Sequence, residues 1–351
     1  MIIIFYNLSL ILAIVILYFS TNWLVLWFLV ELSTLSLVVL LSGRATPRGV
    51  ESAVKYFVVQ GVASVFLLFG AVFNGVWGGS LDLFSSYNLV SYFLIIIGLL
   101  VKLAVFPNPF WIVDVLSGVD LARGAYVILF SKFIPVYLYY IVSGSFLGII
   151  ITVVGVSSII FGSVLGVNQV SVRKIIALSS VSHMGWIVLT FPLLSGSLCF
   201  FVFLSYIFML VPLLWVSNVV SLDYLVKGKN MYYNWGALVV VLVCLLSLGG
   251  FPPLLGFFYK WVMFFVLVES GSFLVSGILI LFNLVSLFFY LQLCHSLVSF
   301  YWPELKLSFF NGLGEMSTKV LSPIFVVGVL FLMIIVFWGA WYISLFSSSW
   351  F

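Results

Sequence analysis

Charged residues are scarce in this sequence. Its 351 residues include only 9 acidic and 13 basic side chains, so 6% of the chain is charged and 65% is hydrophobic. In a water-soluble domain about 25% of the residues are charged. This chain has a mean hydropathy of +1.38 and too few polar side chains to form a surface that faces water. The period-2 alternation of an outer-membrane barrel is also missing. We therefore predict an all-α polytopic membrane protein.

Motifs that bind phosphate, dinucleotides or metals are missing as well. The chain has neither a GxxxxGKS/T loop nor a GxGxxG turn after a strand. Cys199, Cys244 and Cys294 lie in separate apolar runs without metal-ligand spacing, and we interpret them as buried free thiols. The net charge of +4 is dispersed and gives no basis for nucleic-acid binding. We expect no cofactor, metal or nucleic acid bound to this chain.

Long apolar runs, in contrast, recur along the chain. Each has close to the ~20 residues that a helix needs to cross a bilayer. The first begins directly after Met1, so we expect no cleavable signal peptide. Two of the eleven predicted spans are long and contain a break. The spans are 2–19, 22–42, 51–73, 88–117 (broken), 122–142, 145–166, 172–191, 198–219, 235–268 (broken), 272–297 and 322–346.

Outside these spans and within their first few residues, lysine and arginine occur only at alternate connections. They follow spans two, four, six, eight and ten, and the connections between these contain none. The positive-inside rule places the basic connections on the inner side of the membrane. We therefore expect the amino terminus inside and the carboxyl terminus outside. The basic residues are Arg44, Arg48, Arg123, Arg173, Lys174, Lys227, Lys229, Lys306 and Lys319.

A few ionisable residues lie within the predicted spans. They are Glu31 in span two, Lys102 in span four, Lys132 in span five, His183 in span seven and Lys260 in span nine. A charged side chain in the middle of a bilayer costs about 2.5 kcal/mol or more, so such residues usually face a bundle interior or a wet cavity. They are typical of ion pathways, and we predict a proton pathway here.

Structural interpretations of the same residues remain open. A buried lysine can simply tie helices together through carbonyl groups, and His183 is as readily a core histidine as a proton relay. One carboxylate cannot neutralise all the buried lysines, however, so some of them lie in water or lose their proton part of the time. Glu51 and Lys55, four residues apart near the inner end of span three, fit an ordinary interfacial ion pair.

Helix-breaking residues accompany two of the lysines. Pro107 and Pro109 follow Lys102. Proline removes a backbone donor and clashes with the preceding turn, and a broken helix at membrane depth requires protein or a wet cavity to satisfy the freed groups. We expect each break to open a polar path in which the lysine is the titratable group. The helix-breaking residues beside the other lysine, Lys260, precede it in the sequence. They are Gly249, Gly250, Pro252 and Pro253.

The two broken spans also indicate an internal repeat. They are five spans apart and therefore cross the membrane in opposite directions, as in the inverted repeats of transporters. We predict a first repeat at 1–142 (spans one to five) and a second at 145–297 (spans six to ten). A connecting loop and terminal helix follow at 298–351. In this arrangement Glu31 corresponds to His183.

Five motifs extend through nearly the whole chain in a fixed order. In that order they resemble the family of subunit 2 of mitochondrial NADH:ubiquinone oxidoreductase, respiratory complex I. That family belongs with the antiporter-like proton-channel subunits. The motifs are WFLVELSTLSLV, ESAVKYFVVQGVAS, VKLAVFPNPFWIVDVLSG, NQVSVRKIIALSSVSHMGW and LSLGGFPPLLGFFYKW.

The resemblance implies a role for each buried ionisable residue. Glu31 matches the channel glutamate of the family, which pairs electrostatically with the broken-helix lysine matched by Lys102. Lys132 matches the central lysine and Lys260 the lysine of the second broken helix. His183 matches the histidine of the SSxSHxGW motif.

One stretch departs from the family pattern. Members of the family usually read APFHFWVPEV where this chain reads FPNPFWIVDV. Pro109 replaces the histidine, Val113 the later proline and Asp114 the glutamate. A proton-relay role for that histidine therefore cannot apply here, whereas a carboxylate is kept at Asp114.

The resemblance finally implies a proton-translocating subunit in the membrane arm of complex I. NADH, FMN, iron–sulfur clusters and ubiquinone are then expected in other subunits. The expected partners are neighbouring antiporter-like and small hydrophobic subunits and phospholipids. The expected location is the mitochondrial inner membrane, with the amino terminus on the matrix side and the carboxyl terminus on the intermembrane-space side. The alternatives are a stand-alone or Mrp-type cation/proton antiporter subunit and a purely structural scaffold.

Overall fold

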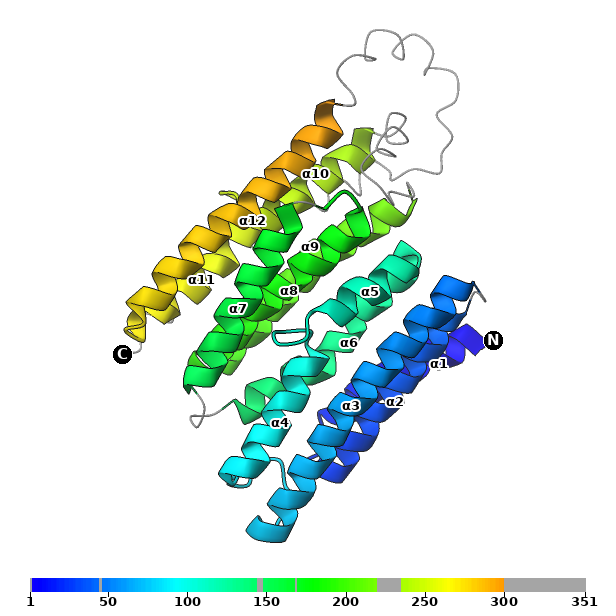
Figure 1. Cartoon of the computed structure of the whole chain (residues 1–351), viewed down its shortest axis with the longest axis vertical. Helices are drawn as coiled ribbons and strands as arrows, with labels where there is room; N and C mark the ends of the chain where they lie inside the picture. Colours follow the sequence, from blue (N-terminus) through cyan, green and yellow to red (C-terminus); the bar gives the residue numbers. More distant parts are fainter. Residues whose placement is uncertain (1, 44–45, 144–147, 168, 220–234, 300–351) are drawn as a thin grey trace. The chain divides into compact units, whose positions relative to one another are not determined.

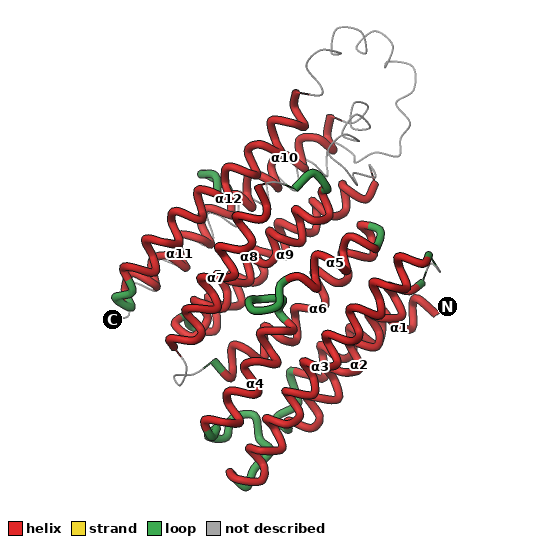
Figure 2. The backbone as a smooth tube through the Cα atoms, viewed as in Figure 1, coloured by secondary structure: helices red, strands yellow, loops and turns green. Residues whose placement is uncertain are grey.

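The computed structural model describes residues 2–43, 46–143, 148–167, 169–219 and 235–299, and the regular elements within these ranges are all helices (Figures 1 and 2). Seven helices in the described part are long and apolar enough to cross a membrane. This confirms an all-helical membrane protein there. The helices are α1 Ile2–Leu17, α2 Trp23–Ser42, α3 Pro47–Gly78, α4 Leu89–Lys102, α5 Phe110–Gly118, α6 Leu121–Val142, α7 Gly148–Val167, α8 Val172–Thr190, α9 Gly196–Val219, α10 Trp235–Gly249, α11 Leu255–Glu269 and α12 Phe273–Ser299.

The helices follow the predicted spans closely. Each of the ten spans from 2–19 to 272–297 contains a helix, and each broken span contains two. The span predicted at 322–346 lies outside the described residues. The largest difference is α3, which begins before 51 and continues beyond 73. Thr46 caps its first turn by accepting a hydrogen bond from the Gly49 amide, and Pro47 occupies the first position, where proline is favoured.

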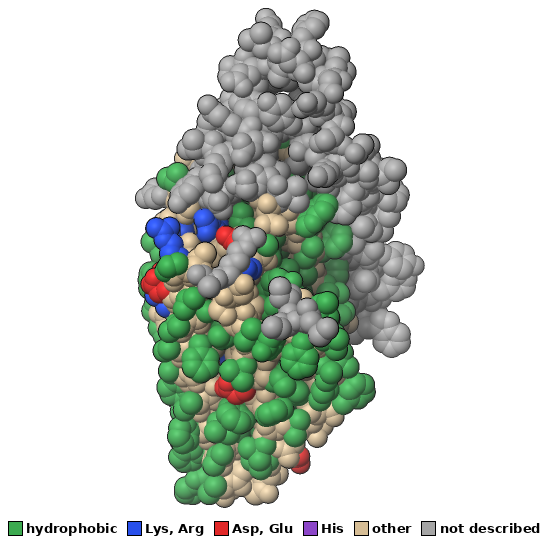
Figure 3. All heavy atoms as spheres, turned by 90° about the vertical axis from the view of Figure 1, so that its right-hand side faces the viewer, with side chains coloured by type: hydrophobic (Ala, Val, Ile, Leu, Met, Phe, Trp, Pro, Cys, Tyr) green, Lys and Arg blue, Asp and Glu red, His purple; other side chains and the backbone are tan. Residues whose placement is uncertain are grey.

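The described part of the protein has a largely apolar surface. Large side chains are exposed on many helices, for example Phe28 at 59% and Trp77 at 76%. Figure 3 shows one face on which hydrophobic side chains predominate and the visible lysine and arginine side chains gather toward one end. Apolar surface of this extent is unfavourable in water and suits a lipid or protein environment.

The described chain forms two compact units. The first contains the residues up to Gly162 together with Ile176–Cys199, and the second contains the rest. In the first unit α3 packs against α2 and α4 and also contacts α5 (Figure 1). Gly70 and Gly98 let α3 and α4 approach closely, since a side chain at either position would meet the facing helix. In the second unit α10, α11 and α12 pack against one another.

Candidate functional site

The first helix break lies between α4 and α5. Helix α4 ends at Lys102, and residues 103–109, including Pro107 and Pro109, form a non-helical connection. The amide of Val105 donates to the Leu100 carbonyl at 3.2 Å, and Ala104 has a left-handed φ of 59°. This is the geometry with which helices commonly end. The Val101 carbonyl, also near the break, accepts from the Ala104 amide at 3.2 Å and from the Trp111 indole of α5 at 3.0 Å.

Lys102 is buried at this break. Its side chain is 1% exposed, and its ammonium group donates to the backbone carbonyl of Gln60 on α3 at 3.2 Å. As the last residue of α4, Lys102 also lies at the partially negative end of the helix, which favours a cation. The positive charge is therefore stabilised by backbone dipoles.

Glu31 does not form a direct ion pair with Lys102 in the described structure. Its half-buried carboxylate on α2 accepts a hydrogen bond from the Thr34 hydroxyl at 3.2 Å. It still interacts electrostatically with Lys102 and with the Tyr56 phenol of α3. The two predicted partners therefore belong to one unit and act on each other without touching.

Lys132 and His183 belong to the same unit. The Lys132 side chain on α6 is 1% exposed, and its ammonium group donates to the Ser180 carbonyl of α8 at 3.4 Å. His183 is 3% exposed and follows Ser180 by three residues, so both lie along one side of α8. Lys132, the predicted central lysine, therefore contacts the side of α8 that carries His183, the motif histidine.

Lys260 lies beside the second break. Helix α10 ends at Gly249, and residues 250–254, including Pro252 and Pro253, connect it to α11. Gly250 has a left-handed φ of 85°. A Cβ atom added at Gly250 would lie 3.1 Å from Cδ of the Lys260 side chain, so Lys260 packs closely against this glycine. The Lys260 ammonium donates to the Gly249 carbonyl at 3.1 Å and to Asn283 Oδ1 of α12 at 2.7 Å. Here the end of α10 supplies an acceptor for the buried lysine, whereas at the first break the acceptor is the Gln60 carbonyl within α3.

Sequence reasoning missed two residues of these sites. Asn283 binds Lys260, and its only signal was a lone amide in the apolar run ILILFNLVSLFFY. Gln60 is 2% exposed, and its backbone carbonyl holds Lys102. Neither contact follows from spacing along the chain, because each joins different helices.

We expect Asn283→Leu to lower proton translocation about tenfold, because it removes one of the two acceptors that hold the protonated Lys260. The measurement is NADH-driven acidification of vesicles, the activity that the family resemblance implies, divided by the amount of assembled enzyme. Ser276→Ala is the matched control, since the buried Ser276 hydroxyl donates to the Phe273 carbonyl of the same helix. Equal rates in the two variants would contradict a role for Asn283.

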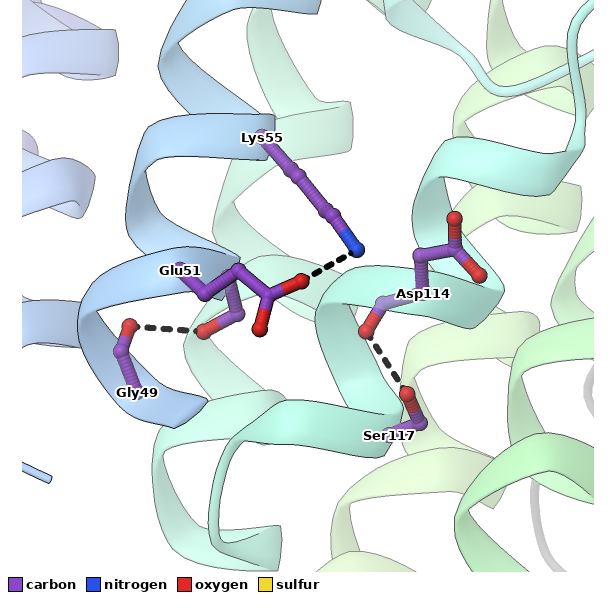
Figure 4. Close-up of polar contacts among 6 residues, drawn as sticks. Gly49, Glu51, Lys55, Asp114 and Ser117 are labelled. Carbon is purple, nitrogen blue, oxygen red and sulfur yellow. Dashed lines mark hydrogen bonds and ion pairs between the residues drawn. The ribbon is translucent and has the colours of Figure 1, made fainter. Parts of the chain in front are cut away.

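A group of exposed charges lies apart from the buried lysines. Lys55 and Glu51 on α3 form an ion pair at 2.7 Å with both side chains largely exposed, and Asp114 of α5 acts electrostatically on Lys55 (Figure 4). This agrees with the predicted i,i+4 ion pair, and an exposed pair of this kind contributes little to stability. Within the described ranges no group of three or more His, Cys, Asp or Glu side chains is arranged to hold a metal ion.

Comparison with known proteins gives consistent matches. Residues 20–288 match the family model described as NADH:quinone oxidoreductase/Mrp antiporter, TM. NADH-ubiquinone oxidoreductase chain 2 of Patiria pectinifera is 35% identical over 295 residues, which cover 81% of this chain and 83% of that protein.

Solved structures share the fold. A chain of respiratory complex I from Thermus thermophilus with bound aureothin gives a TM-score of 0.82 at 21% identity, covering 97% of this chain and 78% of that one. A chain of the Mrp complex from Dietzia sp. DQ12-45-1b gives 0.76 at 20% identity, covering 82% of this chain and 59% of that one.

Proposed function

Because the chain belongs to the family of NADH-ubiquinone oxidoreductase chain 2, we propose that it is a membrane-arm subunit of respiratory complex I. In this role it translocates protons across the mitochondrial inner membrane while other subunits transfer electrons from NADH to ubiquinone. NADH, FMN, the iron–sulfur clusters and ubiquinone belong to those other subunits. This chain contributes to the enzyme through proton movement.

The observation that carries the proposal is the set of three buried lysines whose ammonium groups are held by backbone carbonyls. Lys102, Lys132 and Lys260 are each at most 6% exposed. Burial makes a charged lysine costly, and its acceptors reduce that cost. A change in a neighbouring charge is then sufficient to add or remove a proton, because charges interact strongly inside a protein.

The proposed mechanism is electrostatic. Redox chemistry in other subunits alters the interaction of Glu31 with Lys102. That alteration changes the proton affinity of Lys132 and then of Lys260, with His183 as a relay on α8. Protons enter from the matrix side and leave on the intermembrane-space side.

The proposed topology has eleven membrane spans in two inverted repeats, 1–142 and 145–297, followed by 298–351. It is supported by the two breaks, where α4 and α10 both end in a left-handed turn, at Ala104 and at Gly250. In this topology the amino terminus faces the matrix and the carboxyl terminus faces the intermembrane space. Neighbouring antiporter-like and small hydrophobic subunits and phospholipids cover the apolar surface.

An Mrp-type cation/proton antiporter is the second candidate, favoured by the wider family description. Purified complex in phospholipid vesicles separates the two. A complex I subunit predicts acidification that requires NADH and a ubiquinone analogue and is unchanged by an imposed sodium or potassium gradient. Proton movement driven by a cation gradient in the absence of NADH would instead support the antiporter.

A further inference from the structure

Gln60 is a buried polar residue for which the proposed mechanism has no role. It lies on α3, and its side chain is 2% exposed. Its backbone carbonyl accepts the hydrogen bond from Lys102, while its side-chain amide Nε2 has no hydrogen-bond partner among the described residues. Most buried donors in proteins are paired, so an unpaired one at this position points to a specific role.

The pairing of α2 with α3 places Gln60 opposite Glu31. Helix α2 ends at Ser42 and α3 begins at Pro47, and the two helices pack against each other, so they run in opposite directions. Trp27 of α2 donates through its indole to the Ser64 carbonyl of α3 at 3.2 Å. One turn further along α2 is Glu31, and one turn back along α3 is Gln60. The electrostatic interaction of Glu31 with Tyr56, one more turn back, agrees with this register.

Helix α3 therefore separates the two members of the predicted pair. It packs against α2, which carries Glu31, and against α4, which carries Lys102 (Figure 1). Gln60 is the residue of α3 that contacts Lys102 and also lies level with Glu31. Its amide is neutral, so it can donate to a carboxylate without neutralising it.

We propose that Gln60 is a positioning residue that links Glu31 to Lys102. Its side-chain amide donates through one water to the Glu31 carboxylate, while its backbone carbonyl holds the Lys102 ammonium. The carboxylate is thereby held near the lysine without forming a contact ion pair, and the lysine proton remains exchangeable. The inference rests on the proposed function, because it assigns Gln60 a part in the Glu31–Lys102 couple.

The test uses intact complex I that contains Gln60→Met, a variant of similar length without the amide. We expect NADH-driven proton translocation per assembled enzyme to fall about tenfold, the usual effect of losing a hydrogen bond to a charged group. The amount of assembled enzyme should be unchanged, because methionine is close to glutamine in length and preserves the packing of α3. Ser64→Ala is the control. Its hydroxyl lies one turn away on α3, donates to the Gly61 carbonyl of the same helix, and should be dispensable.

Combination with Glu31→Gln distinguishes positioning from packing. If Gln60 acts through Glu31, the double variant should translocate protons at the same rate as Glu31→Gln alone. Multiplied losses in the double variant, or a normal rate in Gln60→Met, would overturn the inference. If Gln60→Met does not accumulate, Gln60→Leu is measured by the same criteria. Normal translocation in both Glu31→Gln and Lys102→Met would instead refute the proposed couple itself.

Discussion

Lys132→Met should lower NADH-driven proton translocation at least about tenfold while leaving the amount of assembled complex unchanged. Lysine and methionine have similar lengths, so the substitution removes the ammonium group with little change in packing. Because Lys132 is 1% exposed, replacing it with an apolar side chain relieves the cost of burying a charge. Resistance of the complex to thermal inactivation should therefore stay the same or increase.

These two readouts separate a proton carrier from a helix tie. If Lys132 only held α6 and α8 together, removing its hydrogen bond to the Ser180 carbonyl would lower the stability of the complex. Proton translocation per assembled complex would then stay unchanged. Lys174→Met is the matched control, since Lys174 is an exposed lysine near the start of α8. Normal translocation in Lys132→Met together with lower thermal stability would contradict the assignment of Lys132 as a proton carrier.

Gly256→Val is the second substitution with a large expected effect. A Cβ atom at Gly256, in the first turn of α11, would overlap the backbone carbonyl oxygen of Ser247 on α10. Backbone atoms of a packed helix cannot move aside as a flexible side chain can, so we expect destabilisation of more than about 4 kcal/mol. The chain should then fail to accumulate in membranes, as measured by immunoblotting against wild type.

Gly277 provides the control for this prediction. It lies within α12, and a Cβ there would meet nothing within 4 Å. Gly277→Ala should therefore be tolerated and stabilise the helix slightly, by up to about 1 kcal/mol. Normal accumulation of Gly256→Val would show that α10 and α11 do not approach each other as closely as the structure indicates.

The helix breaks illustrate how far the sequence predicts the fold. Composition and run length predicted the helices, and the two glycines at 249–250 marked the end of α10 correctly. At the first break, Pro107 and Pro109 indicated a break, but α4 already ends at Lys102. Ala104 adopts the left-handed conformation that glycine usually occupies, so the sequence contained no signal for the earlier end.

The partners of the buried lysines were less predictable. Spacing and resemblance selected Lys102, Lys132 and Lys260, because a lysine in an apolar run is conspicuous. The acceptors that hold them are mostly backbone carbonyls of other helices, such as Gln60 and Ser180. Every residue has a carbonyl, so only the packing of the helices determines which of them receives a lysine.

A native gel of gently solubilised membranes is the most direct test of membership in complex I. The gel is stained for NADH oxidation, and each band is searched by mass spectrometry for peptides of this chain. We expect the chain to migrate with a very large NADH-oxidising complex. Migration as a small species, absent from that band in mild detergent, would contradict its assignment as a membrane-arm subunit.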